Sequence, residues 1–233
     1  MYKHFFKRFI GFFGALVAVM LLSPLFIFVT LWLHYANKGA GAFFFQERIG
    51  RNNRPFKIIK YKTMTDERGE DGKLLPDQQR LTKVGKFVRS TSMDELPQLF
   101  NILKGDMAFI GPRALPTTYQ FFFTDEEKHR HDVRPGMTGW AQINGRTSIT
   151  WGQKLKYDVE YVKKLTMWFD IKIFFLTIYK VFKRENVGVE TSGAISFHEY
   201  RAAEWEELGK HDLAVKALSQ REALIKEQKR NDV

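Results

Sequence analysis

The feature that most constrains this chain is an uncharged apolar run of 25 residues, Phe9 to Leu33, with Ser23-Pro24 near its centre. As a straight helix the run would extend about 37 Å, which exceeds the ~30 Å hydrocarbon core of a bilayer. Pro24 lacks a backbone N–H and its ring clashes with the preceding turn, so we expect a kink or break there. The Ser23 hydroxyl is a candidate partner for the backbone groups that Pro24 frees. The run therefore predicts a membrane helix that is broken at Ser23-Pro24.

Both flanks of the apolar run are basic, which bears on how the helix enters the membrane. Cytoplasmic flanks carry the excess of Lys and Arg, so a spanning helix would place one basic flank on the unfavoured side. A re-entrant helix, which enters and leaves by the same face, satisfies both flanks; a kinked transmembrane helix is the alternative. A signal peptide is excluded because the apolar region of signal peptides is only ~7–15 residues long, much shorter than this run. The basic residues are Lys3, Lys7 and Arg8 before the run, and Lys38, Arg48, Arg51 and Arg54 after it.

Composition and charge limit what the rest of the chain can do. The 233 residues leave room, after the membrane segment, for one domain with its own core and a short appendage. The chain has no cysteine, which excludes disulfides, thiolate metal sites and a cysteine nucleophile. Of the net charge of +11, a balance of +9 lies in residues 1–64, which indicates attraction to anionic lipid or to a phosphate-bearing substrate at the membrane surface. A nucleic-acid partner is disfavoured because the charge does not follow a groove or a recognition helix.

The pattern after the membrane run predicts a mainly helical α+β fold. Two strands, at 42–49 and 56–64, flank a turn-rich segment and form a short β-hairpin, in which Lys60 and Lys62 share one face. Residues 168–182 are aromatic and aliphatic with interspersed lysines, which suits an amphipathic helix in the membrane interface; a buried core helix is the alternative. The expected divisions are a re-entrant membrane helix at 1–36, a domain on the cytoplasmic face at 37–190 and a charged helical extension at 191–233.

The stretch from Arg89 to Arg113 is the densest in chemically capable side chains and includes Asp94-Glu95. Ser92 and Glu95 have the spacing of a capping box, which would explain both acids without catalysis. Pro97 strains that interpretation, because the helix can instead restart at Pro97 itself. An ionised aspartate is also a nucleophile toward phosphorus, provided that a cation such as Mg²⁺ and nearby arginines offset the repulsion between two anions. The residues alone leave these interpretations open.

Several long motifs occur in a characteristic order between residues 2 and 189. They are Lys7-Arg8 before the apolar run with Ser23-Pro24, then FKIIKYKTM, SMDELPQLFNILKGDM, FIGPR, HDVRPGMTGWAQINGR and Phe169-Asp170-Ile171-Lys172. In these motifs the chain resembles the monotopic polyprenyl-phosphate phosphoglycosyl transferases, the bacterial sugar transferase family, and most of all its small members in glycosylation pathways. Two departures stand out: Ala114-Leu115-Pro116 replaces the more usual Pro-Leu, and the chain continues well past the last shared motif.

The resemblance implies an enzyme, a UDP-sugar:polyprenyl-phosphate sugar-1-phosphate transferase that releases UMP by a ping-pong mechanism with Mg²⁺. The family's catalytic dyad falls on Asp94 and Glu95. Asp94 would be the nucleophile that takes the phosphosugar and a ligand of the metal, and Glu95 would assist. The positions that match phosphate- and substrate-binding residues of the family are Lys60, Arg89, Arg113 and Asp170. The positions expected to contact the nucleotide are Arg134, Gln142, Asn144 and Arg146.

The same resemblance implies the partners and the location of the protein. The partners are a UDP-sugar, polyprenyl (undecaprenyl) phosphate and membrane phospholipid, with downstream glycosyltransferases as further candidates and no nucleic acid. The expected sugar is an N-acetylated hexosamine or a deoxysugar, and the expected location is the cytoplasmic face of the bacterial inner membrane. Two other functions stay open: a non-catalytic membrane scaffold for glycosyltransferases, and direct transfer with Glu95 as base and no covalent intermediate.

Overall fold

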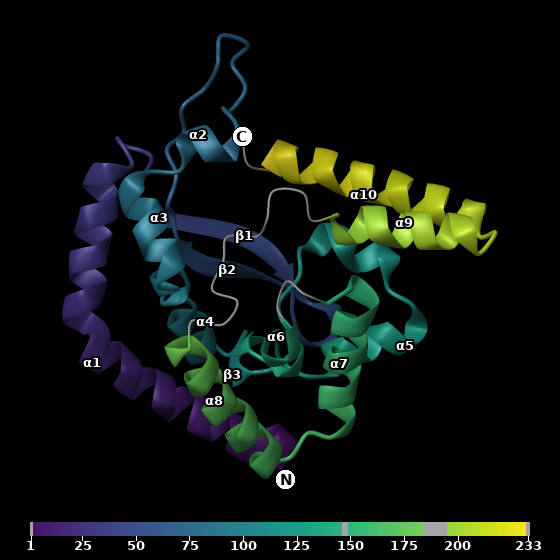
Figure 1. Cartoon of the computed structure of the whole chain (residues 1–233), viewed down its shortest axis with the longest axis horizontal. Coiled ribbons are helices and arrows are strands. Elements are labelled where there is room, and N and C mark those ends of the chain that lie inside the picture. Colours follow the sequence, from purple (N-terminus) through teal and green to yellow (C-terminus); the bar gives the residue numbers. More distant parts are fainter. Residues whose placement is uncertain (1, 146–148, 184–194, 232–233) are drawn as a thin grey trace. The chain divides into compact units, whose positions relative to one another are not determined.

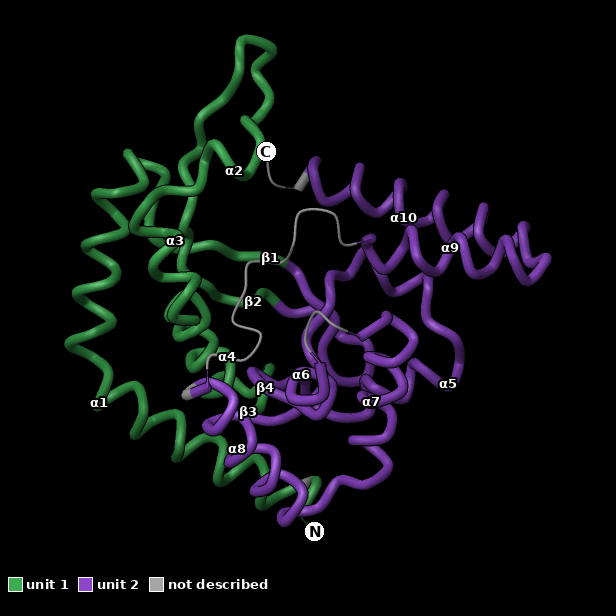
Figure 2. Tube along the Cα trace, in the orientation of Figure 1, with its two compact units in different colours: residues 1–46, 57–109, 187–189 green, residues 47–56, 110–186, 190–233 purple. Residues whose placement is uncertain are grey.

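The computed structural model describes residues 2–145, 149–183 and 195–231, and it is mainly helical with two two-stranded sheets, β1–β2 and β3–β4 (Figure 1). These residues fall into two compact units (Figure 2). The first unit comprises residues 2–46 and 57–109, and the second comprises residues 47–56, 110–145, 149–183 and 195–231. The predicted α+β class with a short β-hairpin is confirmed.

The hairpin pairs β1 (Phe43–Ile49) with β2 (Pro55–Tyr61), close to the predicted bounds. The other elements in the first unit are η1 (Tyr2–Phe6), α1 (Lys7–Ala36), α2 (Asp77–Arg80), α3 (Lys83–Ser90), η3 (Met93–Glu95), α4 (Gln98–Lys104) and the start of β3 (Ala108–Ile110). Those in the second unit are η2 (Arg51–Asn53), η4 (Thr117–Phe122), α5 (Asp125–Lys128), η5 (His129–Asp132), β4 (Gly136–Thr138), α6 (Trp140–Gly145), α7 (Trp151–Lys163), α8 (Met167–Phe182), α9 (Phe197–Glu207) and α10 (His211–Asn231).

Helix α1 contains the apolar run and is long and apolar enough to cross a membrane. The sequence predicts a break at Ser23-Pro24, but the helix continues through both residues as one ribbon that bends between its ends (Figure 1). Pro24 cannot donate to the carbonyl of Met20, four residues earlier, and the Ser23 hydroxyl donates to that carbonyl instead, at 2.8 Å. The predicted role of the Ser23 hydroxyl is therefore confirmed, and this bond helps to explain why the helix bends without breaking.

Both ends of α1 contact the rest of the first unit. At its start, the Arg8 guanidinium donates to the carbonyls of Ile102 and Leu103 at the end of α4, the latter at 2.8 Å. Near its end, the Trp32 ring lies 5.8 Å from the Phe87 ring of α3. A narrow stripe of the helix is buried, whereas large apolar side chains on its other faces stay exposed. The buried residues are Gly11, Ala15, Phe26, Val29 and Leu33.

Helix α4 is attached to β2 by one fully buried side chain, that of Asn101. Its amide nitrogen donates to the Lys57 carbonyl at 2.8 Å, and its oxygen accepts from the Ile59 N–H at 2.9 Å. A single side chain thus occupies a donor and an acceptor of β2, as a neighbouring strand would. This contact fixes α4 beside the strand that carries Lys60.

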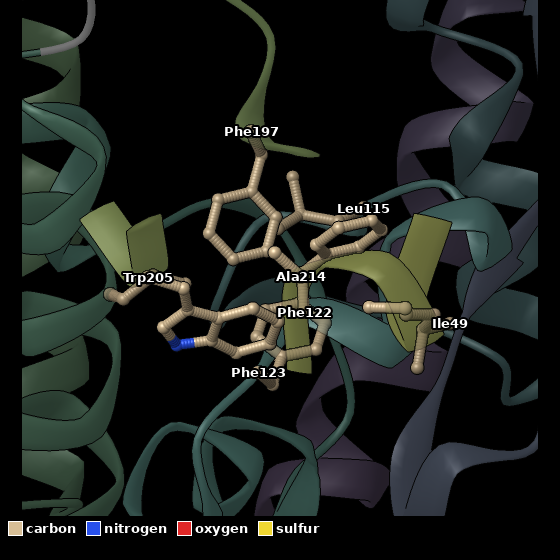
Figure 3. Packing of buried hydrophobic residues seen from close by; sticks show 9 residues of the cluster. Ile49, Leu115, Phe122, Phe123, Phe197, Trp205 and Ala214 are labelled. Atoms are coloured by element: carbon tan, nitrogen blue, oxygen red, sulfur yellow. The ribbon is translucent and has the colours of Figure 1, made fainter. Parts of the chain in front are cut away.

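The core of the second unit is built from segments far apart in the sequence. Figure 3 shows Phe122 and Phe123 from η4 and its end packed with Phe197 and Trp205 from α9 and Ala214 from α10. The sequence predicts a charged helical extension at 191–233. Its described part is helical, but it is no separate appendage, because α9 and α10 supply part of this core.

Helix α8 buries little and presents a broad apolar surface. Ile173 is fully buried, whereas Trp168 is 75% exposed and Phe175 is 64% exposed. Lys172 and Lys183 each lie over an aromatic ring, those of Trp140 and Tyr179. Large exposed aromatic side chains beside lysines suit the interface of a bilayer better than the core of a soluble protein.

Candidate active site

The predicted dyad Asp94-Glu95 lies in the short helical turn η3, between α3 and α4 of the first unit. Helix α3 ends where the Ser92 N–H donates to the Arg89 carbonyl at 3.0 Å and Ser92 adopts the left-handed conformation, with φ of +56°. A left-handed backbone is costly for a residue with a Cβ, by roughly 1 kcal/mol, and such strain is typical of functional turns. The turn therefore directs the chain abruptly from α3 into the dyad.

The predicted capping box at Ser92 is wrong. The Ser92 side chain makes no capping bond, because its left-handed backbone belongs to the end of α3 and not to the start of a helix. Helix α4 begins at Gln98, with Pro97 as its N-cap, so the alternative restart at Pro97 is confirmed. The acids of the dyad are thus not explained as capping residues.

The Glu95 carboxylate is paired with Lys60 instead. Lys60 Nζ lies 2.7 Å from Glu95 Oε1, and the two side chains are only 18% and 15% exposed. A charge-assisted hydrogen bond shielded from water is stronger than one on the surface. This bond joins β2 to η3, and it offsets the charge of one of two adjacent acids.

Arg89 is held by a second bond, to a residue just after β2. Its Nε donates to the Thr63 hydroxyl at 2.8 Å, and Thr63 is 3% exposed. Gly85, one turn before Arg89, packs against the Thr63 carbonyl so closely that an added Cβ would lie 1.9 Å from it. Arg89, Lys60 and Glu95, which the sequence analysis selects separately, are therefore all positioned by one small framework within the first unit.

In the second unit, Arg113 is positioned through its backbone. The buried Arg130 Nη2 donates to the Arg113 carbonyl at 2.7 Å, and the Gly136 N–H donates to the Pro112 carbonyl at 2.9 Å. At Gly111 an added Cβ would lie 2.5 Å from the Arg134 carbonyl, so the FIGPR and RPG motifs pack backbone against backbone. The structure thus brings the segments of Arg113 and Arg134 together.

Asp170, in the first turn of α8, is 5% exposed and lies beside Tyr161 of α7. The Tyr161 hydroxyl is 2.6 Å from Asp170 Oδ1 and 3.2 Å from the carbonyl of Ile110, the second residue of the FIGPR motif. Tyr161 is itself fully buried. Asp170 is therefore linked to the Arg113 segment by a tyrosine that the sequence analysis does not select.

The residues expected to contact the nucleotide have more local roles. The Gln142 amide nitrogen donates to the Met137 carbonyl at 3.0 Å, and the Asn144 amide donates to the Trp140 carbonyl at 2.8 Å. The Gln142 oxygen is buried and has no hydrogen-bond partner in the described part of the chain, which suits a contact with a ligand donor. Arg146 lies outside the described residues.

The sequence analysis also misses a buried charge cluster behind Arg113. Arg130 and Asp158 pair at 2.7 Å with side chains 1% and 5% exposed, and Arg130 Nη1 lies 3.0 Å from His131 Nε2. Burial, and then the charge of Arg130, lower the pKa of His131 to about 3, so the ring is neutral at pH 7 and accepts at Nε2. Burial also raises the pKa of Asp158, and Arg130 opposes that rise. The sequence gives little indication of this cluster, because Arg130 lies in a segment rich in charged residues and nothing in its pattern marks it as buried.

The described residues contain no group of three or more His, Cys, Asp or Glu that could hold a metal ion. This finding limits the kind of metal site, because Mg²⁺ usually binds through one or two carboxylates, water and the phosphates of a substrate. Two adjacent carboxylates, Asp94 and Glu95, provide the oxygen ligand type that such a site requires.

Comparison with known proteins gives a family match over most of the chain. The family model described as bacterial sugar transferase matches residues 2–184. The uncharacterized sugar transferase EpsL of Bacillus subtilis is 44% identical over 173 residues, which cover 74% of this chain and 86% of EpsL.

Two further relatives have names that state a reaction. The UDP-N-acetylgalactosamine-undecaprenyl-phosphate N-acetylgalactosaminephosphotransferase of Aeromonas hydrophila is 37% identical over 182 residues, covering 75% of this chain and 43% of the relative. The UDP-glucose:undecaprenyl-phosphate glucose-1-phosphate transferase of Escherichia coli is 36% identical over 180 residues, covering 72% and 38%. The chain thus spans about two fifths of the length of these longer relatives.

Proposed function

Because the chain belongs to the bacterial sugar transferase family, we propose that it moves a sugar-1-phosphate from a UDP-sugar to undecaprenyl phosphate and releases UMP. The observation that carries this proposal is the shielded pair of Lys60 and Glu95 beside Asp94. Two adjacent carboxylates would repel a diphosphate, and Lys60 removes part of that repulsion. We assign the nucleophile to Asp94, which follows from the family's dyad, and give Lys60 the task of offsetting the charge of Glu95 beside it.

The proposed chemistry has two displacement steps at the same phosphorus. An Asp94 carboxylate oxygen forms a bond to the phosphorus that bears the sugar, and the bond from that phosphorus to the bridging oxygen breaks, which releases UMP. An oxygen of undecaprenyl phosphate then attacks the phosphosugar-aspartyl intermediate, forms the lipid diphosphate and restores the carboxylate. The covalent intermediate separates the two phosphate substrates in time, so one cationic site need not hold both.

The other residues have supporting roles in this proposal. Lys60 orients Glu95, which assists by activating the lipid phosphate. Arg89 and Arg113 bind phosphate oxygens, for which a guanidinium is well suited. Asp170, Arg134, Gln142, Asn144 and Arg146 complete the proposed set, with the last four assigned to the nucleotide. When bound at Asp94, Mg²⁺ would neutralise part of the charge of the diphosphate.

We further propose a monotopic attachment to the cytoplasmic face of the inner membrane, with α1 as a re-entrant helix. Support comes from the contacts of α1, since Arg8 near its start and Trp32 near its end both reach the first unit. A spanning helix would carry one of its ends across the bilayer, away from that unit. The exposed aromatic residues and lysines of α8 are suited to contacts with phospholipid. This attachment keeps the phosphate of the lipid substrate at the depth of the headgroups.

The donor is proposed to be a UDP-linked N-acetylated hexosamine or deoxysugar, and the product would pass to downstream glycosyltransferases. The relatives named above act, by their names, on N-acetylgalactosamine in one case and glucose in the other. A panel of donors should therefore include both kinds of sugar, as well as a deoxysugar.

The experiment that tests this function measures UMP release by the detergent-solubilised protein with undecaprenyl phosphate, Mg²⁺ and each UDP-sugar in turn. The Asp94→Asn variant is compared with Asp71→Asn, which changes an exposed aspartate bonded to the nearby Lys73 backbone N–H. Release with one or two sugars, lost in Asp94→Asn and kept in Asp71→Asn, is the expected result. A folded wild-type protein that releases no UMP with any donor would overturn the proposal and favour the scaffold.

A further inference from the structure

The two segments that the sequence analysis sets apart from the family's usual motifs meet in one core. Leu115, from the altered Ala114-Leu115-Pro116 segment, is 7% exposed and belongs to the same buried cluster as Phe197 and Ala214 of α9 and α10 (Figure 3). The family match ends at residue 184, so both of these helices lie beyond it. The segment after Arg113 and two helices beyond the family match are thus packing partners.

We propose that α9 and α10 form a clamp on the segment that carries Arg113, and that Gln228 of α10 is a positioning residue for donor binding. The clamp itself is a structural inference, and its effect on the donor rests on the function proposed above. The helices act from behind Arg113 and contribute no group to the reaction.

The clearest polar contact of the clamp is the Gln228 side-chain amide. Its nitrogen donates to Glu47 Oε2 at 3.0 Å and to the Thr117 hydroxyl at 3.0 Å. Glu47 belongs to the end of β1, and Thr117 directly follows the altered segment. One side chain near the C-terminal end of α10 thus joins β1 to the residue that follows the altered segment.

The end of β1 and the altered segment are also bonded to each other. The Ile49 N–H donates to the Leu115 carbonyl at 2.9 Å, and Arg48 forms an antiparallel bridge with Pro116. The Tyr119 N–H donates to the Pro116 carbonyl at 3.0 Å. The Gln228 contacts therefore close a small framework that begins two residues after Arg113.

Helix α9 is fastened independently of Gln228. Arg201 is 5% exposed, and its guanidinium pairs with Glu127 of α5 and with Glu204 on its own helix. Trp205 of the same helix stacks on Phe122 with ring centroids 6.1 Å apart. Because α9 and α10 are held by these apolar and ionic contacts, a change at Gln228 alone can loosen the clamp without detaching the helices.

The test is a charge swap between Glu47 and Gln228 in the full-length protein. Gln228→Glu places two carboxylates in contact and breaks the clamp, and the double variant Glu47→Gln/Gln228→Glu restores an amide–carboxylate pair. Gln220→Ala, an exposed glutamine on the same helix, is the control. The first measurement is hydrogen exchange at the Ile49 and Tyr119 amides, which donate to carbonyls of the altered segment.

For Gln228→Glu we expect exchange at these two amides to rise about tenfold, and the KM for the UDP-sugar to rise by a similar factor with kcat nearly unchanged. The double variant should return both quantities to within about twofold of wild type. Unchanged exchange in Gln228→Glu would overturn the clamp, and faster exchange with an unchanged KM would overturn its role in donor binding. Hydrogen exchange needs no turnover, so a wild-type protein that releases no UMP would refute the proposed function while the clamp is still tested.

Discussion

The two units hold their predicted site residues in different ways. In the first unit, the side chains of predicted site residues are held by one another, as Lys60 is by Glu95, or by a hydroxyl, as Arg89 is by Thr63. In the second unit, Arg113 is held through its backbone carbonyl by the buried Arg130, and FIGPR packs on the RPG turn through glycines. Bonds between side chains position the predicted residues in the first unit, whereas contacts to the backbone position Arg113 in the second. The two halves should therefore fail differently when they are altered.

The largest expected effect concerns Asp94, the proposed nucleophile in the first unit. Incubation with a UDP-sugar and Mg²⁺ but no lipid acceptor should add the mass of one sugar phosphate to the protein, at Asp94. In Asp94→Asn the adduct should be absent and UMP release should fall by at least about 10³-fold, because an amide is a poor nucleophile. Intact-protein mass spectrometry and peptide mapping measure both. Turnover with the acceptor but no adduct would instead support direct transfer with Glu95 as base.

The next effect is on stability, in the scaffold of the second unit. Arg130→Met leaves the buried Asp158 without its partner and the Arg113 carbonyl without its donor. We expect the free energy of unfolding to fall by about 3–5 kcal/mol, whereas Arg130→Met/Asp158→Leu should recover much of that loss because no charge stays buried alone. Chemical denaturation in detergent measures this.

The recovered double variant then sharpens the comparison. If the stability of the double variant returns but its KM for the UDP-sugar is higher than that of wild type, Arg130 acts on Arg113 beyond its contribution to stability. A double variant with wild-type kinetics would show that the Arg113 carbonyl needs no donor.

A smaller effect is expected in the first unit for Lys60→Met, which removes the ammonium but keeps most of the apolar side chain. Glu95 would then be a shielded carboxylate without its lysine, and kcat/KM should fall about 100-fold with a much smaller change in stability. Lys57→Met, at an exposed position of the same strand, is the matched control. A large loss of stability with unchanged kinetics would assign the pair to folding, as the Arg130 pair is.

This contrast also explains how far the sequence predicts the molecule. Lys60, Arg89, Asp94 and Glu95 could be selected because they lie in motifs that match those of the family, and the hairpin because its strands and turn have local signals. Asn101 and Tyr161 were missed because a buried polar residue looks like any other until its backbone partners are known.

The remaining errors concern long-range packing and local geometry. The tail was taken for an appendage because Phe197, Trp205 and Ala214 reveal their burial only once η4 is packed beside them. The capping box at Ser92 failed because the spacing of Ser92 and Glu95 does not show that α3 ends in a left-handed residue. The family's motifs supplied the reaction, which composition and periodicity alone left open.

The smallest expected effect is a pH dependence of stability that comes from the second unit, where His131 contacts Arg130. Its pKa is about 3 in the folded protein, held down by burial and then by Arg130, against an ordinary value of 6.5. Below pH 6.5 the unfolded chain binds a proton that the folded chain does not, so stability present at pH 7.5 is lost as the pH falls toward 3. At pH 5 this loss should be about 2 kcal/mol.

His131→Gln keeps an acceptor for Arg130 but does not titrate. Between pH 7.5 and pH 5, the free energy of unfolding should therefore fall by about 2 kcal/mol less in this variant than in wild type. The exposed His129→Gln should follow the wild-type curve. Equal pH dependence in wild type and His131→Gln would mean that the His131 ring reaches water in the folded state. The buried contacts behind Arg113 would then open to water in the folded protein. The second unit would hold its predicted site residues no more firmly than the first.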